Sequence, residues 1–234
     1  FIVQDSLWII AEATGVAIYD FDFRQFFECC TPYDPPKSVS GVARVGAFED
    51  YEAFYSNAAE MGINLVHTPS DHLRCTSLPI WYPLIKSFTP RSRWYSEIPS
   101  FEQVEGEIGL PVFVKGARQT SRHSAAASVV RSRQDFDAAT KIFESDPILH
   151  WQDFVCRELI ELRRVTGGSE EKVPASFEFR TFWWRGALVG SGRYWFEADD
   201  YHWSDVEKSA ALEIAKHAVE ALDCTFLVVD LAQT

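Results

Sequence analysis

The chain lacks the features that define several large classes of protein. None of its 234 residues lies in an apolar run approaching the roughly 18 residues of a membrane-spanning helix, so no membrane span is expected. Basic residues are scarce: 22 Lys and Arg stand against 34 Asp and Glu, which gives a formal net charge of −12. Because phosphate contacts supply most non-specific affinity for nucleic acid, this charge argues against a nucleic-acid partner. An anion bound by this chain must therefore meet a local cluster of cations.

The sequence signatures of common catalytic and metal sites are also missing. The five cysteines form no CxxC pair, which disfavours a disulfide framework or a zinc knuckle and favours buried thiols in a reducing cytoplasm. The six histidines show no HExxH spacing, which disfavours a zinc enzyme. A metal site within residues 67–72 is one alternative, but a polar loop after a strand is the favoured interpretation. The Walker loop, the GxGxxG fingerprint and the GxSxG elbow are all absent.

What is present indicates a folded protein with a substantial core. Apolar residues make up 47% of the chain and aromatic residues 15%, and both are spread along its whole length. This composition excludes a disordered or low-complexity protein. The length is sufficient for one large domain or two modest ones. Because the chain starts at Phe1 and stops abruptly at Thr234, we expect it to be a piece of a longer protein.

Short apolar runs alternate with a helical pattern near the start of the chain. Strands are predicted at residues 7–14, 16–21, 41–48 and 63–69, with a turn-rich loop at 29–38 and a helix at 49–62. Gly62 is the predicted C-terminal cap of that helix. This alternation favours a small α/β unit over residues 1–88.

The rest of the chain begins with a proline-rich stretch and continues as a second alternating unit. We expect residues 77–99 to be a connector in which Thr89 and Pro90 open a short helix. The elements predicted after it are a strand at 111–117, a helix at 132–144 with a capping box at Ser132 and Asp135, a strand at 148–155, a hairpin at 177–195 that turns at Arg185 and Gly186, a helix at 204–222 with a capping box at Ser204 and Glu207, and a strand at 224–234.

The aromatic hairpin carries charges on one face. Side chains alternate along a strand, so Glu178 and Arg180 share a face with Phe182 and Trp184. Arg193 lies on the return strand, and two arginines near one carboxylate would suit an anionic ligand. The alternative is a cross-strand salt bridge on the solvated face of an antiparallel sheet.

Two further positions carry charge where an apolar pattern is otherwise unbroken. Lys115 ends a strand and precedes a loop of small and polar residues that includes Arg118, Ser121 and His123. This pattern fits either a surface strand with a solvated loop or a clamp that closes over phosphates. Asp230 lies near the end of a buried-type strand, where it is either a turn former or a Mg²⁺ ligand.

The order of these parts resembles the ATP-grasp superfamily, over about residues 77–234. The motifs that carry the resemblance are WYP followed by TP, then VKG, QDFV, the E-x-R hairpin ending in GRYW, and VVDLAQT. The implied fold class is α/β (α+β) with an ATP-grasp fold. A pre-ATP-grasp α/β domain would occupy residues 1–88, and an ATP-grasp domain whose two α+β subdomains clasp the nucleotide would occupy residues 89–234.

The resemblance also implies roles for individual residues. Lys115 corresponds to the strand lysine that reaches the phosphates and the adenine edge, and Lys86 is a weaker match to an earlier phosphate lysine. Residues 119–125 correspond to the mobile loop over the phosphates, although the usual glycines are absent. The hinge whose backbone reads adenine would be Gln152, Asp153, Phe154 and Val155.

The hairpin and the last strand supply the remaining implied roles. Glu178 matches an acidic position that contacts the nucleotide ribose or the hinge. Arg180 and Arg193 would face the triphosphate or an acyl phosphate, as the catalytic residues. Asp230 matches the first Mg²⁺ carboxylate, and an acid-x-asparagine pair for the second metal position is expected after Thr234.

The implied activity is that of an ATP- and Mg²⁺-dependent ligase in the cytoplasm. It would join a carboxylate to an amine or a thiol through an acyl phosphate, on a small molecule or a peptide. The partners implied are thus ATP and these substrates, with neither nucleic acid nor membrane, and a homodimer is compatible with them. The alternative function is a non-catalytic ATP-binding module that works as a protein-assembly or interaction factor.

Overall fold

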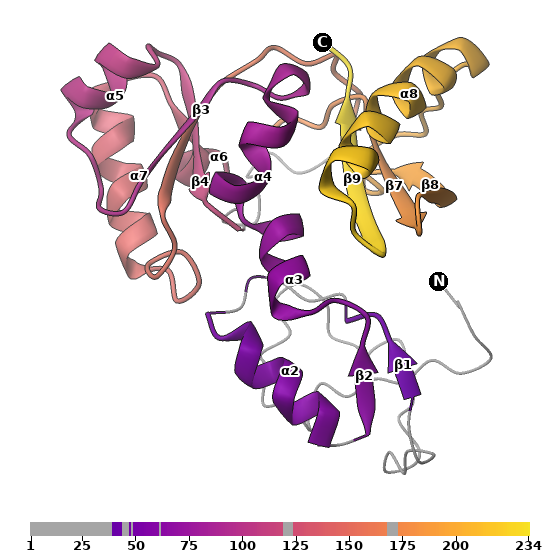
Figure 1. Ribbon diagram of the computed structural model, residues 1–234. Helices are drawn as coiled ribbons and strands as arrows, with labels where there is room; N and C mark the ends of the chain where they lie inside the picture. Colours follow the sequence, from indigo (N-terminus) through magenta and orange to yellow (C-terminus); the bar gives the residue numbers. More distant parts are fainter. Residues whose placement is uncertain (1–38, 44–46, 48, 61, 119–123, 168–172) are drawn as a thin grey trace. The chain divides into compact units, whose positions relative to one another are not determined.

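The computed structural model divides the chain into two compact units, Phe1–Pro69 and Ser70–Thr234 (Figure 1). The residues it describes are 39–43, 47, 49–60, 62–118, 124–167 and 173–234. The strands predicted at 7–14 and 16–21 and the loop predicted at 29–38 lie outside them. Within the described part of the chain, no helix has the length and apolar character needed to cross a membrane.

The first unit contains a parallel strand pair joined by a helix. Strand β1 (Val39–Gly41) pairs with β2 (Ile63–Leu65), and α2 (Tyr51–Glu60) runs between them. This βαβ connection confirms the predicted alternation, and Gly62 takes a positive φ of 79° just after the helix. The strand predicted from Gly41 was wrong in register, because β1 ends at that glycine.

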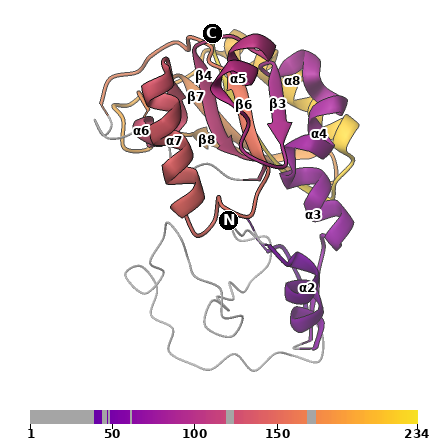
Figure 2. The same ribbon diagram turned by 90° about the vertical axis from the view of Figure 1, so that its left-hand side faces the viewer.

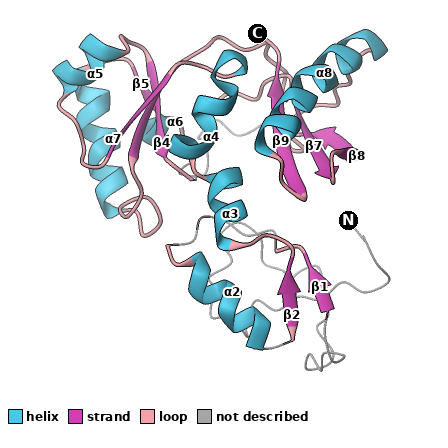
Figure 3. Cartoon of the chain, in the orientation of Figure 1, coloured by secondary structure: helices cyan, strands magenta, loops and turns pink. Residues whose placement is uncertain are grey.

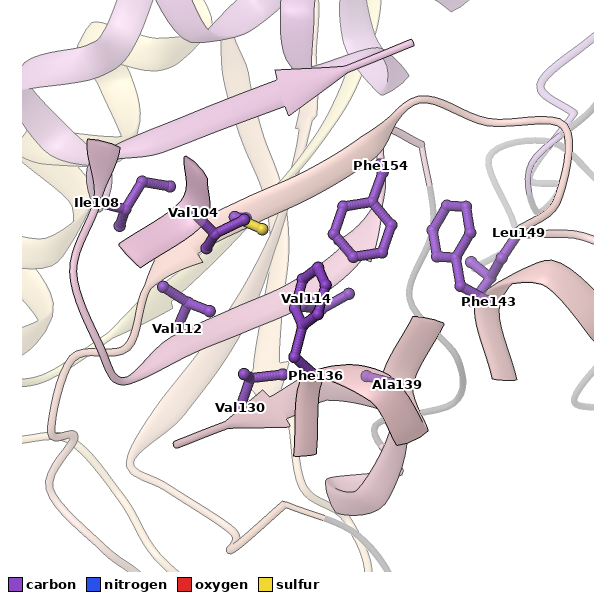
Figure 4. Packing of buried hydrophobic residues seen from close by; sticks show 11 residues of the cluster. Val104, Ile108, Val112, Val114, Val130, Phe136, Ala139, Phe143, Leu149 and Phe154 are labelled. Atoms are coloured by element: carbon purple, nitrogen blue, oxygen red, sulfur yellow. The ribbon is translucent and has the colours of Figure 1, made fainter. Parts of the chain in front are cut away.

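The second unit is built on two antiparallel sheets. The first has the order β3-β6-β4-β5, from β3 (Ser92–Tyr95), β6 (Phe154–Glu158), β4 (Val112–Gly116) and β5 (Val129–Val130). Helices α5 (Phe101–Glu107) and α7 (Arg133–Ser145) cover one face of it (Figure 3). The buried core under these helices includes Val112, Val114, Phe136, Phe143 and Phe154 (Figure 4). The predicted strand around Lys115 and the helix capped by Ser132 are confirmed, since the Ser132 side chain accepts from the Asp135 amide.

The proline-rich stretch is helical, which corrects the expected connector. Helices α3 (Pro69–Thr76) and α4 (Leu78–Ile85) are followed by a 3₁₀ turn, η1 (Lys86–Phe88). Apolar burial overrides the prolines: Leu78 is fully buried in a cluster with Ala117 and Val155, and Trp81 packs against that cluster. The helix expected at Thr89 is absent, and strand β3 begins three residues later. The polar loop expected at 67–72 is likewise largely the start of α3.

The second sheet has the order β8-β7-β9 and is covered on one face by α8. Its strands are β7 (Glu178–Trp184), β8 (Ala187–Arg193) and β9 (Phe226–Ala232), and α8 spans Asp205–Leu222. The hairpin turn is confirmed at Arg185 and Gly186, whose φ angles of 49° and 78° suit a two-residue primed turn. The Ser204–Glu207 capping box is also confirmed. Trp183 packs under α8 with Ala215 and Val219.

Candidate functional site

The two sheets of the second unit each leave one face free of the helices that form their cores. In β4 and β6 the alternate positions Lys115, Val155 and Arg157 point away from α5 and α7. In β7 the alternate positions Glu178, Arg180 and Phe182 point away from α8. The two sheets stand side by side in Figure 1 and one behind the other in Figure 2. Charged side chains from both sheets therefore share the space between them.

Lys115 is the clearest chemical feature of the first sheet. Burial lowers its pKa to about 7, the charge of Arg157 lowers that pKa further, and the carboxylate of Asp230 opposes both effects. Asp230 belongs to β9, so its influence on the pKa of Lys115 means that the two sheets bring these residues together. No hydrogen bond or ion pair joins the Lys115 ammonium to another residue in the described ranges, so its charge is available to a ligand.

Arg180 and Asp230 form the matching feature of the second sheet. They are directly opposite in the β7–β9 ladder, and Nε and Nη2 of Arg180 lie 2.7 and 2.8 Å from the two carboxylate oxygens. The guanidinium also lies 4.6 Å from the centre of the Tyr194 ring. The hydrogen bond to Asp230 raises the pKa of Arg180, and burial raises the pKa of Tyr194 to about 12. Tyr194 was not among the predicted site residues.

Glu178 shares the free face of β7, but its carboxylate is tied to its own sheet. Oε1 accepts hydrogen bonds from the Ser176 hydroxyl and from Nε1 of Trp195, the latter at 2.9 Å. Its backbone oxygen accepts from the Tyr201 hydroxyl at 2.7 Å. These bonds hold the start of β7 in place, and a contact from Glu178 to a nucleotide stays a prediction.

A β-bulge places Arg193 on the opposite face from Arg180. The β7–β8 register shifts by one residue between Phe182 and Trp183, so Arg193 pairs with Phe179. A regular ladder would have placed it opposite Glu178, and a one-residue slip reverses the direction of every side chain that follows. The Arg193 guanidinium instead pairs with Asp200 at 2.6 Å. The structure therefore does not bring Arg193 to the cluster of Lys115, Arg180 and Asp230.

The predicted hinge residues lie at the start of β6 rather than between the sheets. Gln152 accepts from the Arg118 amide and donates to the Ile148 carbonyl. The Asp153 carbonyl accepts from the Ala117 amide. Phe154 and Val155 are buried strand residues, so the strand predicted at 148–155 is displaced towards the C-terminus.

The chain leaves the first sheet after Glu158 and joins the second sheet through the following residues. The Leu159 amide still donates to the Pro111 carbonyl, whereas the Arg163 amide donates to the Gln233 carbonyl next to β9. The segment that connects the two sheets therefore begins at Glu158. Its backbone, rather than that of residues 152–155, occupies the position between the two faces.

The remaining predicted residues are dispersed. Lys86 is exposed in η1, and no contact in the described ranges links it to Lys115. Arg118 lies 5.5 Å from the centre of the Trp151 ring, and burial lowers its pKa. Ser121 and His123 lie outside the described residues.

The residues that the structure describes do not gather a metal site. No group of three or more His, Cys, Asp or Glu side chains in them could hold a metal ion. Asp230 engages both carboxylate oxygens with Arg180, and Glu178 is bound to Ser176 and Trp195. Two hollows of about 420 and 430 Å³ occur in this unit, one beside α5 and one beside the Arg185–Gly186 turn, and neither is lined by Lys115, Arg180 or Asp230.

A lysine-bearing antiparallel sheet, opposed by a second sheet with an Arg–Asp pair, defines an ATP-grasp type of nucleotide-binding fold. Solved structures agree on the fold. A RimK domain protein of Sphaerobacter thermophilus is 16% identical with a TM-score of 0.55, over 83% of this chain and 67% of that one. D-alanine–D-alanine ligase of Bacillus anthracis, complexed with ATP, is 14% identical with a TM-score of 0.52, over 77% and 58%. Cdc123 of Schizosaccharomyces pombe is 14% identical with a TM-score of 0.51, over 73% and 85%.

Residues 86–234 match the family model described as an "ATP-grasp domain", family 3 of its clade, and the chain belongs to that family. The predicted superfamily and the mixed α/β fold class are thereby confirmed. Among curated proteins, D-alanine–D-alanine ligase A of Brucella melitensis biotype 1 is 30% identical over 112 residues, which are 47% of this chain. The match spans only 29% of that relative. The domain boundary predicted at residue 88 stays a prediction, since the family match and the compact unit begin at residues 86 and 70.

Proposed function

We propose that the chain binds ATP between the two sheets of its second unit and uses it to ligate a carboxylate to an amine or a thiol. The observation that carries this proposal is the approach of Lys115, from the first sheet, to the Arg180–Asp230 pair of the second. Membership of an ATP-grasp family supports the same reading. In a chain with a net charge of −12, such a cluster is a specific place for a polyanion.

The chemistry proposed is a transfer in two steps. A carboxylate oxygen of the first substrate attacks the γ-phosphorus of ATP, ADP leaves, and an acyl phosphate forms. The amine or thiol of the second substrate then attacks the acyl carbon, and inorganic phosphate leaves. The protein contributes mainly positioning and stabilisation of the negative charge, and both are roles that fixed cations can perform.

The two cations suit these roles differently. Lys115 presents a point charge with three donors, and its lowered pKa means that a bound phosphate would draw it into the protonated form. Arg180 is held in a fixed orientation by Asp230 and by the Tyr194 ring, so it would meet the phosphates without reorganisation. We propose no phosphate contact for Arg193, because it faces away from both residues.

Magnesium is implied by the resemblance, but the described residues fit it only in part. Mg²⁺ in nucleotide sites is held by one or two carboxylates together with phosphate oxygens. Asp230 is the one carboxylate at this position whose neighbours include Lys115, and Arg180 already binds both of its oxygens. We therefore assign no step to the metal, and the role of Asp230 as a metal ligand stays a prediction.

A second candidate function is an ATP-binding module without ligase activity. The observation that favours it is the same bidentate contact, which occupies the carboxylate that a catalytic metal would need. Such a module would bind the nucleotide to stabilise a surface for a partner protein. It predicts ATP binding without turnover.

The experiment that separates these functions is a screen for ADP release. The full protein is incubated with ATP, Mg²⁺ and pooled carboxylates with amines or thiols, including amino acids and short peptides. Hydroxylamine in a parallel reaction traps an acyl phosphate as a hydroxamate. ADP release that depends on both substrates, together with hydroxamate formation, is expected for the ligase. ATP binding that yields neither product would favour the binding module.

A further inference from the structure

Arg157 occupies the same sheet face as Lys115 and was not singled out by its sequence. It is the fourth residue of β6, where it lies opposite Phe113 of β4 and Ser92 of β3. Lys115 lies opposite Val155, two residues earlier, so the two cations are diagonal neighbours on adjacent strands. Diagonal neighbours on one face have Cβ atoms roughly 7–8 Å apart, within reach of two long side chains. The two positive charges therefore interact directly.

The Arg157 guanidinium is held firmly on one side. Nε donates to the Ser92 hydroxyl oxygen at 3.2 Å, and that hydroxyl in turn donates to the Pro90 carbonyl at 2.9 Å. The guanidinium carbon lies 5.7 Å from the centre of the Trp81 ring, on helix α4. The hydroxyl and the ring fix the orientation of the planar group before any ligand arrives.

The other side of the guanidinium has no acceptor. Nη2 of Arg157 is buried and lacks a hydrogen-bond partner among the residues that the structure describes. No carboxylate in the described ranges lies within ion-pair distance of it. The nearest acid in sequence, Glu158, is exposed and lies 4.0 Å from Arg91. Burial of a charged donor without a partner is costly, so a site of this kind is retained where a ligand supplies the acceptor.

We propose that Arg157 is a phosphate-binding residue of the nucleotide site, with Nη2 donating to an anionic phosphate oxygen beside the one that Lys115 binds. This inference rests on the proposed nucleotide binding and adds the residue that reads the phosphate chain from β6. Two cations on one face and Arg180 on the other give three fixed positive charges for one polyanion. A neutral acceptor on the base would leave the charge of Arg157 uncompensated, which is why a phosphate oxygen is the better partner.

The test uses the full protein and calorimetric titration of three probes: a non-hydrolysable ATP analogue, inorganic tripolyphosphate and adenosine. Arg157→Met should weaken both the ATP analogue and tripolyphosphate about 10- to 100-fold, the effect of losing one hydrogen bond between charged groups, and should leave adenosine unchanged. Arg157→Lys, which keeps the charge but loses the fixed fork, should recover part of the affinity.

Arg93→Met is the matched control, because it removes the same charge from the same sheet on its opposite face. Arg93 is opposite Cys156 in the β3–β6 ladder, and its exposed side chain lies 3.9 Å from Glu107. Its effect on all three probes should be less than twofold at moderate salt. Thermal unfolding without ligand shows whether each variant is folded.

The outcomes separate this inference from the proposed function. If the wild-type protein binds neither the ATP analogue nor tripolyphosphate, the proposed nucleotide site fails. If it binds them and folded Arg157→Met binds equally well, only the role of Arg157 is refuted. A loss of adenosine affinity with unchanged tripolyphosphate affinity would make Arg157 a reader of the base and would also overturn the proposal.

Discussion

Arg180 and Asp230 face one another across the β7–β9 ladder and exchange two parallel hydrogen bonds of 2.7 and 2.8 Å. The pair joins the middle strand of the second sheet to the strand that ends it. It therefore links the stability of β9 to the orientation of the guanidinium at the site. The side chains are 28% and 39% exposed, so solvent screens part of the attraction between them.

A double-mutant cycle should detect this pair. Arg180→Gln and Asp230→Asn should each lower the free energy of unfolding, and the double variant should lose less than their sum. We expect a coupling free energy of about 0.5–1 kcal/mol, as is usual for partly exposed pairs. Urea denaturation of the four proteins measures it. Strictly additive losses would mean that the contact does not stabilise the fold in solution.

Removing the Lys115 charge should stabilise the protein while impairing its site. In Lys115→Met the cost of burying an ammonium disappears, and an apolar chain of similar length takes its place. The variant should therefore have a higher free energy of unfolding than the wild type at neutral pH, measured by urea denaturation. A Lys115→Met protein less stable than the wild type would show that the ammonium has a stabilising partner.

The pH dependence of that gain follows from the pKa of Lys115. Burial lowers this pKa from an ordinary value of 10.5 to about 7, so between these values the unfolded chain binds more protons than the folded one. Wild-type stability from this residue therefore rises with pH across that window, and the cost of the charge is present in full below it. The advantage of Lys115→Met should shrink between about pH 7 and about pH 10. A difference that does not change with pH would contradict the lowered pKa.

The capping box of α8 offers a test of the fold that is independent of the site. Ser204→Ala removes the side chain that accepts the Glu207 amide and should lower the free energy of unfolding by about 1 kcal/mol. Ser209→Ala, in the exposed middle of the same helix, is the control and should be neutral or slightly stabilising. Equal effects of the two changes in thermal unfolding would mean that the cap does not contribute.

Local signals made much of this structure predictable. The turn at Arg185 and Gly186, the caps at Ser132 and Ser204, and the alternation around Lys115 depend on residues close in sequence, and all were found. The shared face of Glu178 and Arg180 followed from the two-residue period of a strand.

The parts that sequence reasoning missed depend on contacts between distant residues. Helix α4 forms despite two prolines because Leu78 is buried beside Ala117 and Val155, which lie far away along the chain. The bulge that turns Arg193 away has no marker in the apolar pattern, so a regular ladder was the natural expectation. Arg157 would have been found from the strand period had β6 been placed at 154–158 rather than at 148–155.

The most direct test of the account is calorimetric titration of the full protein with a non-hydrolysable ATP analogue and Mg²⁺. We predict saturable binding to the wild type, and a loss of about 10- to 100-fold in affinity for Lys115→Met. Lys141→Met, an equal change of charge on the exposed face of α7, should bind like the wild type. An absence of binding by the wild type, or equal affinity in a folded Lys115→Met protein, would contradict the nucleotide site described above.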